Sequence, residues 1–455
     1  MTHASELKMR RAGLPEPAIA TFHRHLERVL AGESGLLPDA ELEPVGRVPD
    51  LGSLPHTVDA DALARAVVIK LNGGLGTSMG TTRAKSLLEA REGLSFLDVV
   101  ARQVLALRAR HAVRLPLVLM NSFFTREDSL AALGRYRDLP ADVPLDFLQH
   151  RVPKLRADDL QPVSWPAQPE LEWCPPGHGD LYAALATSGL LARLLDRGYR
   201  YAFVSNADNL GAVLHPAILA WFAAERLPFV MEVVVGTEAD RKGGHLARRA
   251  DGRLVVRESA QTPAADAASF RDVARWRDYN TNNLWIDLTR LDGLDGPVDL
   301  PLIVNRKTVD PADPATPAVL QLETAMSGGI GLFDGAQALR VPRTRFAPVK
   351  TTDDLLVLRS DVYASGHDGR VEPQGGVPFV DLDPEHFGTI AGYERHFPHG
   401  APSLRGCERF VVRGDVTFGR GVVARGRVEL AGGPAHVADW TVLEGRWPSV
   451  RKQAP

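Results

Sequence analysis

The feature that most constrains the fold is a series of apolar, β-branched runs separated by helical segments between residues 61 and 365. The runs are AVVIKL (66–71), PLVLMNS (116–122), YAFVSN (201–206), PFVMEVVV (228–235) and RLVVRESA (253–260). Continuous apolar strands that alternate with helices are typical of sheets buried on both faces. The pattern therefore predicts an α/β core with a parallel or mixed sheet covered by helices on both sides.

The first of these runs leads directly into a glycine-rich loop, and Lys85 comes shortly after this loop. The glycines of this loop are Gly73, Gly74, Gly76 and Gly80. Glycine lacks a Cβ and tolerates positive φ, so backbone N–H groups can turn toward an anion, and a lysine adds formal charge. The residues alone fit a phosphate-binding loop and a tight turn between a strand and a helix equally well.

Two common nucleotide-binding patterns do not match this loop. No Gly-Lys-Ser/Thr follows at the Walker A spacing, which excludes a P-loop NTPase. The Rossmann pattern is only partly approached by Gly74-Leu75-Gly76, because Gly80 falls four residues beyond Gly76. A dinucleotide-dependent oxidoreductase is therefore disfavoured.

Composition limits the partners and the location of the protein. The chain has 455 residues, is 44% hydrophobic and carries a net charge of −3 without a basic stripe, so we expect a large core and no nucleic-acid partner. Cys174 and Cys407 lie far apart without metal-ligand spacing, which predicts a disulfide-free, cytoplasmic protein. The N-terminal segment lacks the apolar stretch of a signal peptide and runs such as LPLVLM are strand-sized, so we expect no membrane partner.

The chain divides into three predicted regions, which are residues 1–60, 61–365 and 366–455. The first begins with a helical pattern and continues as a turn-rich linker. Its apolar positions at helical spacing are Ile19, Phe22, Leu26 and Leu30. In the last region, residues 404–430 carry apolar positions close to six residues apart and punctuated by glycines, which fits either short β-helix coils or an ordinary β-meander.

The fuller loop sequence KLNGGLGTSMG (70–80), followed by Lys85-Ser86, resembles the nucleotide-binding loop of the eukaryotic-type UDP-glucose pyrophosphorylases, the UTP:glucose 1-phosphate uridylyltransferases. The resemblance continues in order through VLMNSF (118–123), FLQHRVPKL (147–155), PPGHGDLY (175–182), FVSNADNLG (203–211), MEVVVGTEADRKGGHL (231–246), NTNNLWI (280–286), VNRKT (304–308), LETAM (322–326) and RFAPVKTTDDLL (345–356). Ten ordered segments, the loop included, are far more specific than one glycine loop.

This resemblance implies a fold and an activity. Residues 61–365 would form a Rossmann-like, mixed-sheet nucleotidyltransferase core of the glycosyltransferase-A type, and residues 366–455 a short left-handed β-helix that can mediate a homo-oligomer. The enzyme would join UTP and glucose 1-phosphate reversibly into UDP-glucose and pyrophosphate. In-line attack of the sugar phosphate on the α-phosphorus needs cations and alignment but no protein nucleophile or strong base.

The resemblance also implies which residues bind the substrates. Lys85 and Lys350 would contact phosphates as mobile, compact charges. The residues expected at the nucleotide are Leu71, Gly73, Gly74, Gly76, Gln149 and Gly177. Those expected at the sugar phosphate are His178, Asn206, Gly244, Glu258, Asn280 and Asn282. Read without the resemblance, a single lysine or histidine is more often a surface or structural group, and NTNN (280–283) favours a polar turn that opens a strand.

Asp208 is the candidate ligand for Mg²⁺. It follows the apolar run YAFV at a predicted strand end, where open α/β sheets collect ligand-binding residues. One aspartate is enough, because Mg²⁺ typically keeps several waters and binds one or two carboxylates together with substrate phosphates. From spacing alone, an Asx turn formed by Asp208 and Asn209 is equally consistent.

The chain departs from the family pattern at two places. Arg83-Ala84 stands where many members have Gly-Pro, and Cys174 stands where an aromatic residue is common. We expect the Arg83 side chain to face solvent. Two other functions stay open, namely a related pyrophosphorylase with another or broader sugar 1-phosphate specificity and a catalytically silent nucleotide-sugar-binding protein. Retention of Lys85, Asp208 and Lys350 argues against the silent protein.

Overall fold

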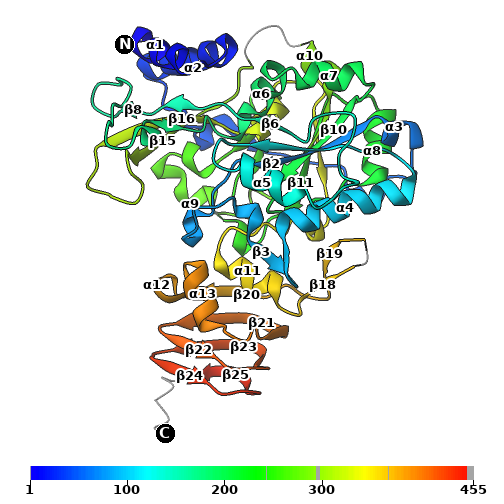
Figure 1. Cartoon of the computed structure of the whole chain (residues 1–455), viewed down its shortest axis with the longest axis vertical. Coiled ribbons are helices and arrows are strands. Elements are labelled where there is room, and N and C mark those ends of the chain that lie inside the picture. Colours follow the sequence, from blue (N-terminus) through cyan, green and yellow to red (C-terminus); the bar gives the residue numbers. More distant parts are fainter. Residues whose placement is uncertain (1, 242, 294–297, 367, 448–455) are drawn as a thin grey trace.

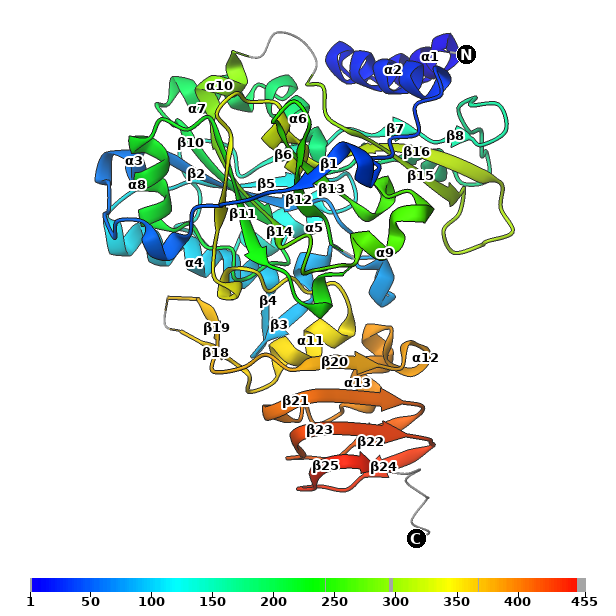
Figure 2. The ribbon, with the colours of Figure 1, turned by 180° about the vertical axis from the view of Figure 1, so that it is seen from behind.

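The computed structural model describes residues 2–241, 243–293, 298–366 and 368–447, and its centre is a ten-stranded mixed sheet. The strands are β1 (Leu42–Pro44), β2 (Ala66–Asn72), β5 (Leu117–Asn121), β6 (Asp146–Leu148), β10 (Tyr201–Asn206), β11 (Phe229–Val235), β12 (His245–Arg249), β13 (Leu254–Arg257), β14 (Asp278–Asp287) and β17 (Gln337–Arg340). Seven follow the order β1-β12-β14-β10-β2-β5-β6, while β11 pairs with β14 and β17, and β13 pairs with β12. All five predicted runs form strands of this sheet, among them β2, β10 and β11 in Figure 1, and β1 adds an edge strand from the predicted linker (Figure 2).

Both parallel and antiparallel pairs occur in the sheet. Strand β2 pairs in parallel with β5 and β10, whereas β14 runs antiparallel to β10 and β11. The carboxyl ends of β2, β5 and β10 therefore meet at one edge. The prediction of a mixed α/β sheet is confirmed.

Helices cover both faces of this sheet. Alternate residues of β2 enter two different cores, with Val68 on one side and Val67 and Ile69 on the other, as the two-residue period of a strand requires. The Val68 side packs against α3 (Ala60–Ala64), α4 (Phe96–His111), α5 (Arg126–Leu133) and α8 (Pro216–Ala224). The opposite side packs against α6 (Leu181–Thr187), α7 (Leu190–Asp196) and α10 (Leu288–Asp292).

The structure rules out the polar turn that the sequence favoured at residues 280–283. NTNN lies inside this continuous ten-residue strand, so its interpretation as a polar turn is wrong. The hydroxyl of Thr281 donates to the Glu232 carbonyl oxygen at 2.7 Å, and the Asn283 amide donates to the Glu232 carboxylate at 3.0 Å. Partners on a neighbouring strand thus satisfy these polar groups within the sheet.

The two N-terminal helices, α1 (Thr2–Arg11) and α2 (Glu16–Leu30), lie over a small sheet at one end of the molecule (Figure 2). This sheet consists of β8 (Leu155–Arg156), β15 (Leu302–Thr308) and β16 (Ala318–Thr324), with β7 (Val152–Pro153) and β9 (Trp173–Cys174) paired beside it. Ile19, Phe22 and Leu26 are buried there, as their spacing predicts, while Leu30 at the helix end is 40% exposed. Cys174 packs in the same apolar cluster, and both Cys174 and Cys407 are free thiols.

The C-terminal region is a stack of parallel strands (Figure 1). Its strands are β20 (Phe379–Leu382), β21 (Ser403–Arg413), β22 (Val416–Phe418), β23 (Val423–Ala431), β24 (Ala435–Val437) and β25 (Val442–Trp447). Every pair among them is parallel, and partners such as Phe410 and Val428 are eighteen residues apart. The β-meander alternative is therefore wrong, because consecutive strands of a meander pair antiparallel.

A continuous apolar core joins this stack to the large sheet. It runs from α4 through α11 (Thr352–Arg359) and α13 (Ile390–His396) into β21 and β23. The remaining helices and strands are α9 (Ala267–Phe270), α12 (Pro384–Phe387), β3 (Glu89–Arg91), β4 (Leu94–Ser95), β18 (Tyr363–Ser365) and β19 (Val371–Pro373). Residues 367 and 448–455 of the predicted third region lie outside the described residues. Among the described helices, none combines the length and the apolar character needed to cross a bilayer.

Candidate active site

A cleft of about 260 Å³ opens at the carboxyl ends of β2 and β10. Nine of the predicted site residues line it, namely Leu71, Gly73, Gly74, Lys85, Gln149, Gly177, His178, Asn206 and Asp208. Those that do not line it are Gly76, Gly244, Glu258, Asn280, Asn282 and Lys350. Residues from five segments far apart in the sequence thus meet at one sheet edge, as expected for an open α/β sheet.

The loop after β2 folds back on itself before it reaches Lys85. The Gly76 N–H donates to the Arg83 carbonyl at 3.2 Å, and the Lys85 N–H donates to the Gly74 carbonyl at 3.1 Å. A Cβ on Gly76 would lie 2.2 Å from the Thr81 methyl group. Gly76 therefore shapes the loop itself, which explains why it does not line the cleft.

The unusual loop exit is built into this folded-back structure. Ala84 is fully buried, whereas the Arg83 side chain is 74% exposed and lies 3.9 Å from the Asp128 carboxylate. The prediction that Arg83 faces solvent is confirmed.

Two glycines of the cleft provide room for close neighbours. A Cβ on Gly73 would lie 2.8 Å from Oε1 of Gln149, and one on Gly177 would lie 2.3 Å from the Thr324 carbonyl oxygen. Gly177 also has φ of +79°, which side chains rarely adopt. The Gln149 backbone N–H donates to the Asn121 carbonyl at 2.8 Å, while its side-chain amide has no hydrogen bond within the described ranges. That amide can both donate to and accept from a ligand.

Lys85 and Asp208 form an ion pair in the cleft. Their Nζ and Oδ2 atoms are 2.7 Å apart, and the side chains are only 17% and 19% exposed. The other carboxylate oxygen of Asp208, Oδ1, is buried and has no hydrogen-bond partner among the described residues. Because a buried oxygen without a partner costs free energy, this atom is one that a cation or a hydrogen-bond donor of a ligand could satisfy.

The Asx-turn alternative for Asp208 and Asn209 is wrong. The Asp208 carboxylate pairs with Lys85 rather than with a following N–H. The Asn209 side chain accepts from the Ala347 N–H at 3.0 Å and donates to the Asn283 amide oxygen at 3.2 Å. Both residues therefore form long-range contacts.

Lys350 reaches the same region from a distant part of the chain. The Val349 N–H donates to the Asp208 carbonyl at 3.3 Å, which holds the segment before Lys350 against the end of β10. Burial raises the pKa of the Asp354 carboxyl, and the positive charges of Lys350 and Lys85 oppose that shift. Both lysines therefore act on one carboxylate, although the exposed Lys350 does not line the cleft.

Asp354 is a residue that the sequence analysis did not single out. Its Oδ2 atom accepts from the backbone N–H groups of Lys350 and Thr351, at 2.7 and 3.0 Å. Together with Thr351 it forms the capping box that begins α11. The spacing Thr-x-x-Asp before an apolar run is the signal that could have identified it.

Four predicted sugar-binding residues gather where β12 begins, where β13 ends and in the first half of β14. A Cβ on Gly244 would lie 2.6 Å from the Glu258 carboxylate. The Asn280 amide donates to the Asn282 amide oxygen at 2.8 Å, and the Asn282 N–H donates to the Asn280 amide oxygen at 2.8 Å. Burial raises the pKa of Glu258, and the charge of Lys350 opposes this shift. Lys350 is thus electrostatically coupled to this cluster.

His178 is held as a neutral hydrogen-bond donor. Burial lowers its pKa to about 4, so the ring is uncharged at pH 7. Its Nδ1 atom accepts from the Met326 N–H at 3.0 Å, which places the ring proton on Nε2. This arrangement fits binding of an anionic oxygen better than transfer of a proton.

Known proteins match this chain over most of its length. Residues 19–425 match the family model described as UTP--glucose-1-phosphate uridylyltransferase. An enzyme of that name from Musa acuminata is 38% identical over 92% of this chain and 92% of its own. UDP-glucose pyrophosphorylase from Leishmania major, solved in open and closed forms, is 42% identical with a TM-score of 0.93 and covers 99% of this chain and 98% of its own.

A variant of the Leishmania major enzyme solved in complex with UDP-glucose is equally similar. It has 42% identity and a TM-score of 0.93, and the match covers 98% of each chain. The solved structures match the chain over nearly its whole length, whereas the family model covers the large sheet and ends at residue 425, within β23. The chain belongs to the UTP--glucose-1-phosphate uridylyltransferase family.

Proposed function

We propose that this protein catalyses the reversible formation of UDP-glucose and pyrophosphate from UTP and glucose 1-phosphate. The observation that carries the proposal is the Lys85–Asp208 pair, because it places a cation and a potential metal ligand beside the glycine loop. Membership of the family, and the UDP-glucose complex of the Leishmania major relative, support the same reaction.

The proposed step needs charge neutralisation and alignment. An oxygen of the sugar phosphate attacks the α-phosphorus of UTP, a new P–O bond forms, and the bond to pyrophosphate breaks with its electron pair leaving on pyrophosphate. The attacking phosphate is already ionised, so no general base is required. Lys85 and Lys350 would offset phosphate charge, and His178 would donate its Nε2 proton in a hydrogen bond.

Asp208 is our proposed ligand for Mg²⁺, because its Oδ1 atom has no hydrogen-bond partner among the described residues and Mg²⁺ prefers oxygen ligands. Bound Mg²⁺ would neutralise phosphate charge. Asp208→Asn should raise the Mg²⁺ concentration that gives half-maximal velocity. Asp128→Asn, at an exposed carboxylate outside the cleft, is the matched control. An unchanged Mg²⁺ titration of Asp208→Asn would reject the assignment.

Amides and one carboxylate should bind the glucose hydroxyls. Asn206, Asn280 and Asn282 offer amides, and the Glu258 carboxylate beside Gly244 can accept from hydroxyls. The alternative of another or broader sugar specificity is testable with a panel of sugar 1-phosphates. We expect glucose 1-phosphate to have the highest kcat/KM, and a higher value for another sugar would replace this substrate assignment.

The central experiment measures pyrophosphate release by the purified protein with UTP, glucose 1-phosphate and Mg²⁺. We expect turnover that requires all three. Binding of UDP-glucose without any turnover would instead identify a silent nucleotide-sugar-binding protein.

Five further proposals come from the sequence and its family resemblance. We propose that the sheet is of the Rossmann-like, glycosyltransferase-A type, and that the C-terminal stack is a left-handed β-helix, for which the parallel pairing is supporting evidence. The division at residues 60 and 365, the cytoplasmic location and a homo-oligomer formed through the C-terminal region also remain proposals. Light scattering of the full-length protein tests the last.

A further inference from the structure

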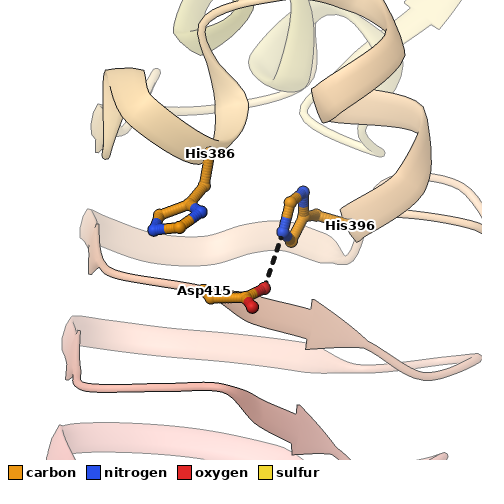
Figure 3. Close-up of side chains that lie close together, drawn as sticks. All are labelled: His386, His396 and Asp415. Atoms are coloured by element: carbon orange, nitrogen blue, oxygen red, sulfur yellow. Dashed lines mark hydrogen bonds and ion pairs between the residues drawn. The ribbon is translucent and has the colours of Figure 1, made fainter.

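Three potential metal ligands lie together far outside the cleft, where helices α12 and α13 meet the parallel stack. Figure 3 shows His386 and His396 reaching from the two helices toward Asp415, which precedes β22. One ligand atom from each residue lies within 4.8 Å of the others. We propose that His386, His396 and Asp415 bind a divalent transition-metal ion of the Zn²⁺ type.

His396 is oriented as metal-ligating histidines usually are. Its side chain is 3% exposed, and its Nδ1 atom lies 2.7 Å from the Gly392 carbonyl oxygen. A carbonyl oxygen can only accept, so Nδ1 carries a proton and donates it. This hydrogen bond directs Nε2 into the cluster, and it is the outer contact that typically fixes a ligating imidazole.

The second ring nitrogen of His396 faces the Asp415 carboxylate. Nε2 lies 3.0 Å from Oδ1 of Asp415. In the neutral ring, Nε2 bears a lone pair because the proton is on Nδ1, so two acceptors face each other. A cation between them, or a second proton on the ring, must resolve this contact.

His386 distinguishes these two solutions. Its ring is partly exposed and makes no hydrogen bond in the part of the chain that the structure describes. It lies edge-on to His396, with ring centroids 5.9 Å apart. An ion pair between His396 and Asp415 uses two of the three groups, whereas a metal ion uses all three.

The donor set selects the kind of metal. Two imidazoles and one carboxylate suit Zn²⁺ and related transition metals, with a fourth position left to water, whereas Mg²⁺ prefers oxygen ligands. Tetrahedral ligands about 2.1 Å from zinc lie about 3.4 Å apart. The 3.0 Å contact between His396 and Asp415 is close to this value.

The backbone around the cluster is well anchored. The Gly414 N–H donates to the Asp383 carboxylate at 2.8 Å, and the Ala435 N–H donates to the Asp415 carbonyl at 2.9 Å. A Cβ on Gly392 would lie 2.4 Å from the His386 carbonyl oxygen, so the two helices approach each other closely. These contacts hold together the two helices and the turn before β22, which carry the three side chains.

The connection between α12 and α13 also lies against the glycine loop of the candidate active site. Thr389, between the two histidines, caps α13 by accepting from the Gly392 N–H at 3.0 Å. Its methyl carbon would lie 2.9 Å from a Cβ on Gly80, the last glycine of the loop. A metal ion held by His386 and His396 would therefore hold the surface on which the loop rests.

Calorimetric titration of ZnCl₂ into the full-length, tag-free and chelator-treated protein, with excess Mg²⁺ present, tests the site. We expect one Zn²⁺ per chain with micromolar or tighter affinity, and a loss of at least about tenfold in His386→Ala. His399→Ala changes an exposed histidine just after α13 and should leave Zn²⁺ binding unchanged. Asp208→Asn should also leave it unchanged, because Asp208 lies in the cleft.

A second variant and a spectrum keep the test decisive. Asp415→Asn should also weaken Zn²⁺ binding, and Co²⁺ should produce the visible absorption of a tetrahedral site in the wild type but not in His386→Ala. Without metal, His386→Ala should retain the wild-type Tm, since its ring makes no hydrogen bond in the described structure. No Zn²⁺ uptake by the wild type, equal uptake by His386→Ala, or loss of uptake in Asp208→Asn would overturn the proposal.

Discussion

The two sides of the candidate active site are built in different ways. The proposed nucleotide side consists of Gly73, Lys85, Gln149, Gly177 and Asp208, and the proposed sugar side of Gly244, Glu258, Asn280 and Asn282. On the nucleotide side, glycines leave space, while the Gln149 amide and the Asp208 Oδ1 atom have no partner in the described structure. On the sugar side, Asn280 and Asn282 already bond to each other.

This difference shows where each side is vulnerable. The nucleotide side is shaped by missing side chains and one ion pair, so added volume or a lost charge should damage it most. The sugar side depends on polar atoms that exchange partners when a ligand arrives, so altered hydrogen bonding should change selectivity and affinity. The following variants test this distinction, starting with the largest expected effect.

Lys85→Ala should lower kcat by about 10²–10³, because it removes a charge at the phosphates and leaves the Asp208 carboxylate without its partner. Lys350→Ala should also lower kcat, since its charge acts at the same site. Pyrophosphate release measures both effects, with circular dichroism to confirm folding. Arg83→Ala, at a 74% exposed side chain, is the control and should remain active. Activity close to wild type in both lysine variants would show that Lys85 and Lys350 do not have the proposed roles at the phosphates.

Gly73→Ala and Gly244→Ala separate the two sides directly. A methyl group at residue 73 collides with the Gln149 amide at 2.8 Å, whereas one at residue 244 collides with the Glu258 carboxylate at 2.6 Å. We expect Gly73→Ala to raise the KM for UTP, and Gly244→Ala to raise the KM for glucose 1-phosphate, each by about tenfold or more.

Gly46→Ala controls for the general effect of replacing a glycine, because no atom lies within 4 Å of a Cβ at that position. Initial velocities with each substrate varied in turn give the two KM values. If both cleft variants weaken the same substrate, the distinction between a nucleotide side and a sugar side fails.

Glu258→Gln should have the smallest effect, a rise of about tenfold or less in the KM for glucose 1-phosphate, because the amide keeps the shape but loses the charge. Burial raises the pKa of Glu258, so folding favours its protonated form. Its stabilising contribution is therefore present at low pH and is lost as pH rises through the raised pKa. At neutral pH the glutamine variant should consequently have a Tm equal to or above that of the wild type.

The same raised pKa gives a pH test. As pH falls through it, wild-type Glu258 takes up a proton and loses acceptor capacity, so the KM for glucose 1-phosphate should rise. The Glu258→Gln variant should lack this component of the pH profile. A lowered Tm with an unchanged KM would show that Glu258 is structural rather than sugar-binding.

Much of the large sheet was predictable from local sequence. The runs that became β2, β5, β10 and β11 are nearly continuous in apolar residues, and that is sufficient to identify strands buried on both faces. The start of strand β14 was not predicted in this way, because Thr281 and Asn283 belong to a polar segment that is typical of a turn. Their partner Glu232 lies on β11, about fifty residues earlier in the chain, and local pattern contains no information about such pairing.

The proposed metal site in the C-terminal region could not be predicted from the sequence either. His386, His396 and Asp415 have no recognisable ligand spacing, since helices α12 and α13 and the turn before β22 bring them together. The six-residue periodicity of the stack was visible, but it fitted two architectures. Only the parallel register, with Phe410 beside Val428, decided between them.

By itself, the sequence determined the chemistry available to this protein, namely a glycine loop after a buried strand, two lysines and an aspartate at a strand end. Local residue types dictate strand formation, backbone freedom and charge, so these features can be recognised without a fold. The tertiary structure alone decided that Lys85 pairs with Asp208 and that Oδ1 of Asp208 stays unpaired in the described residues. It also brought Lys85 and Lys350 close enough to Asp354 for their charges to oppose the rise that burial causes in the pKa of that carboxyl. Contacts of this kind depend on strand order and on packing between segments that are hundreds of residues apart.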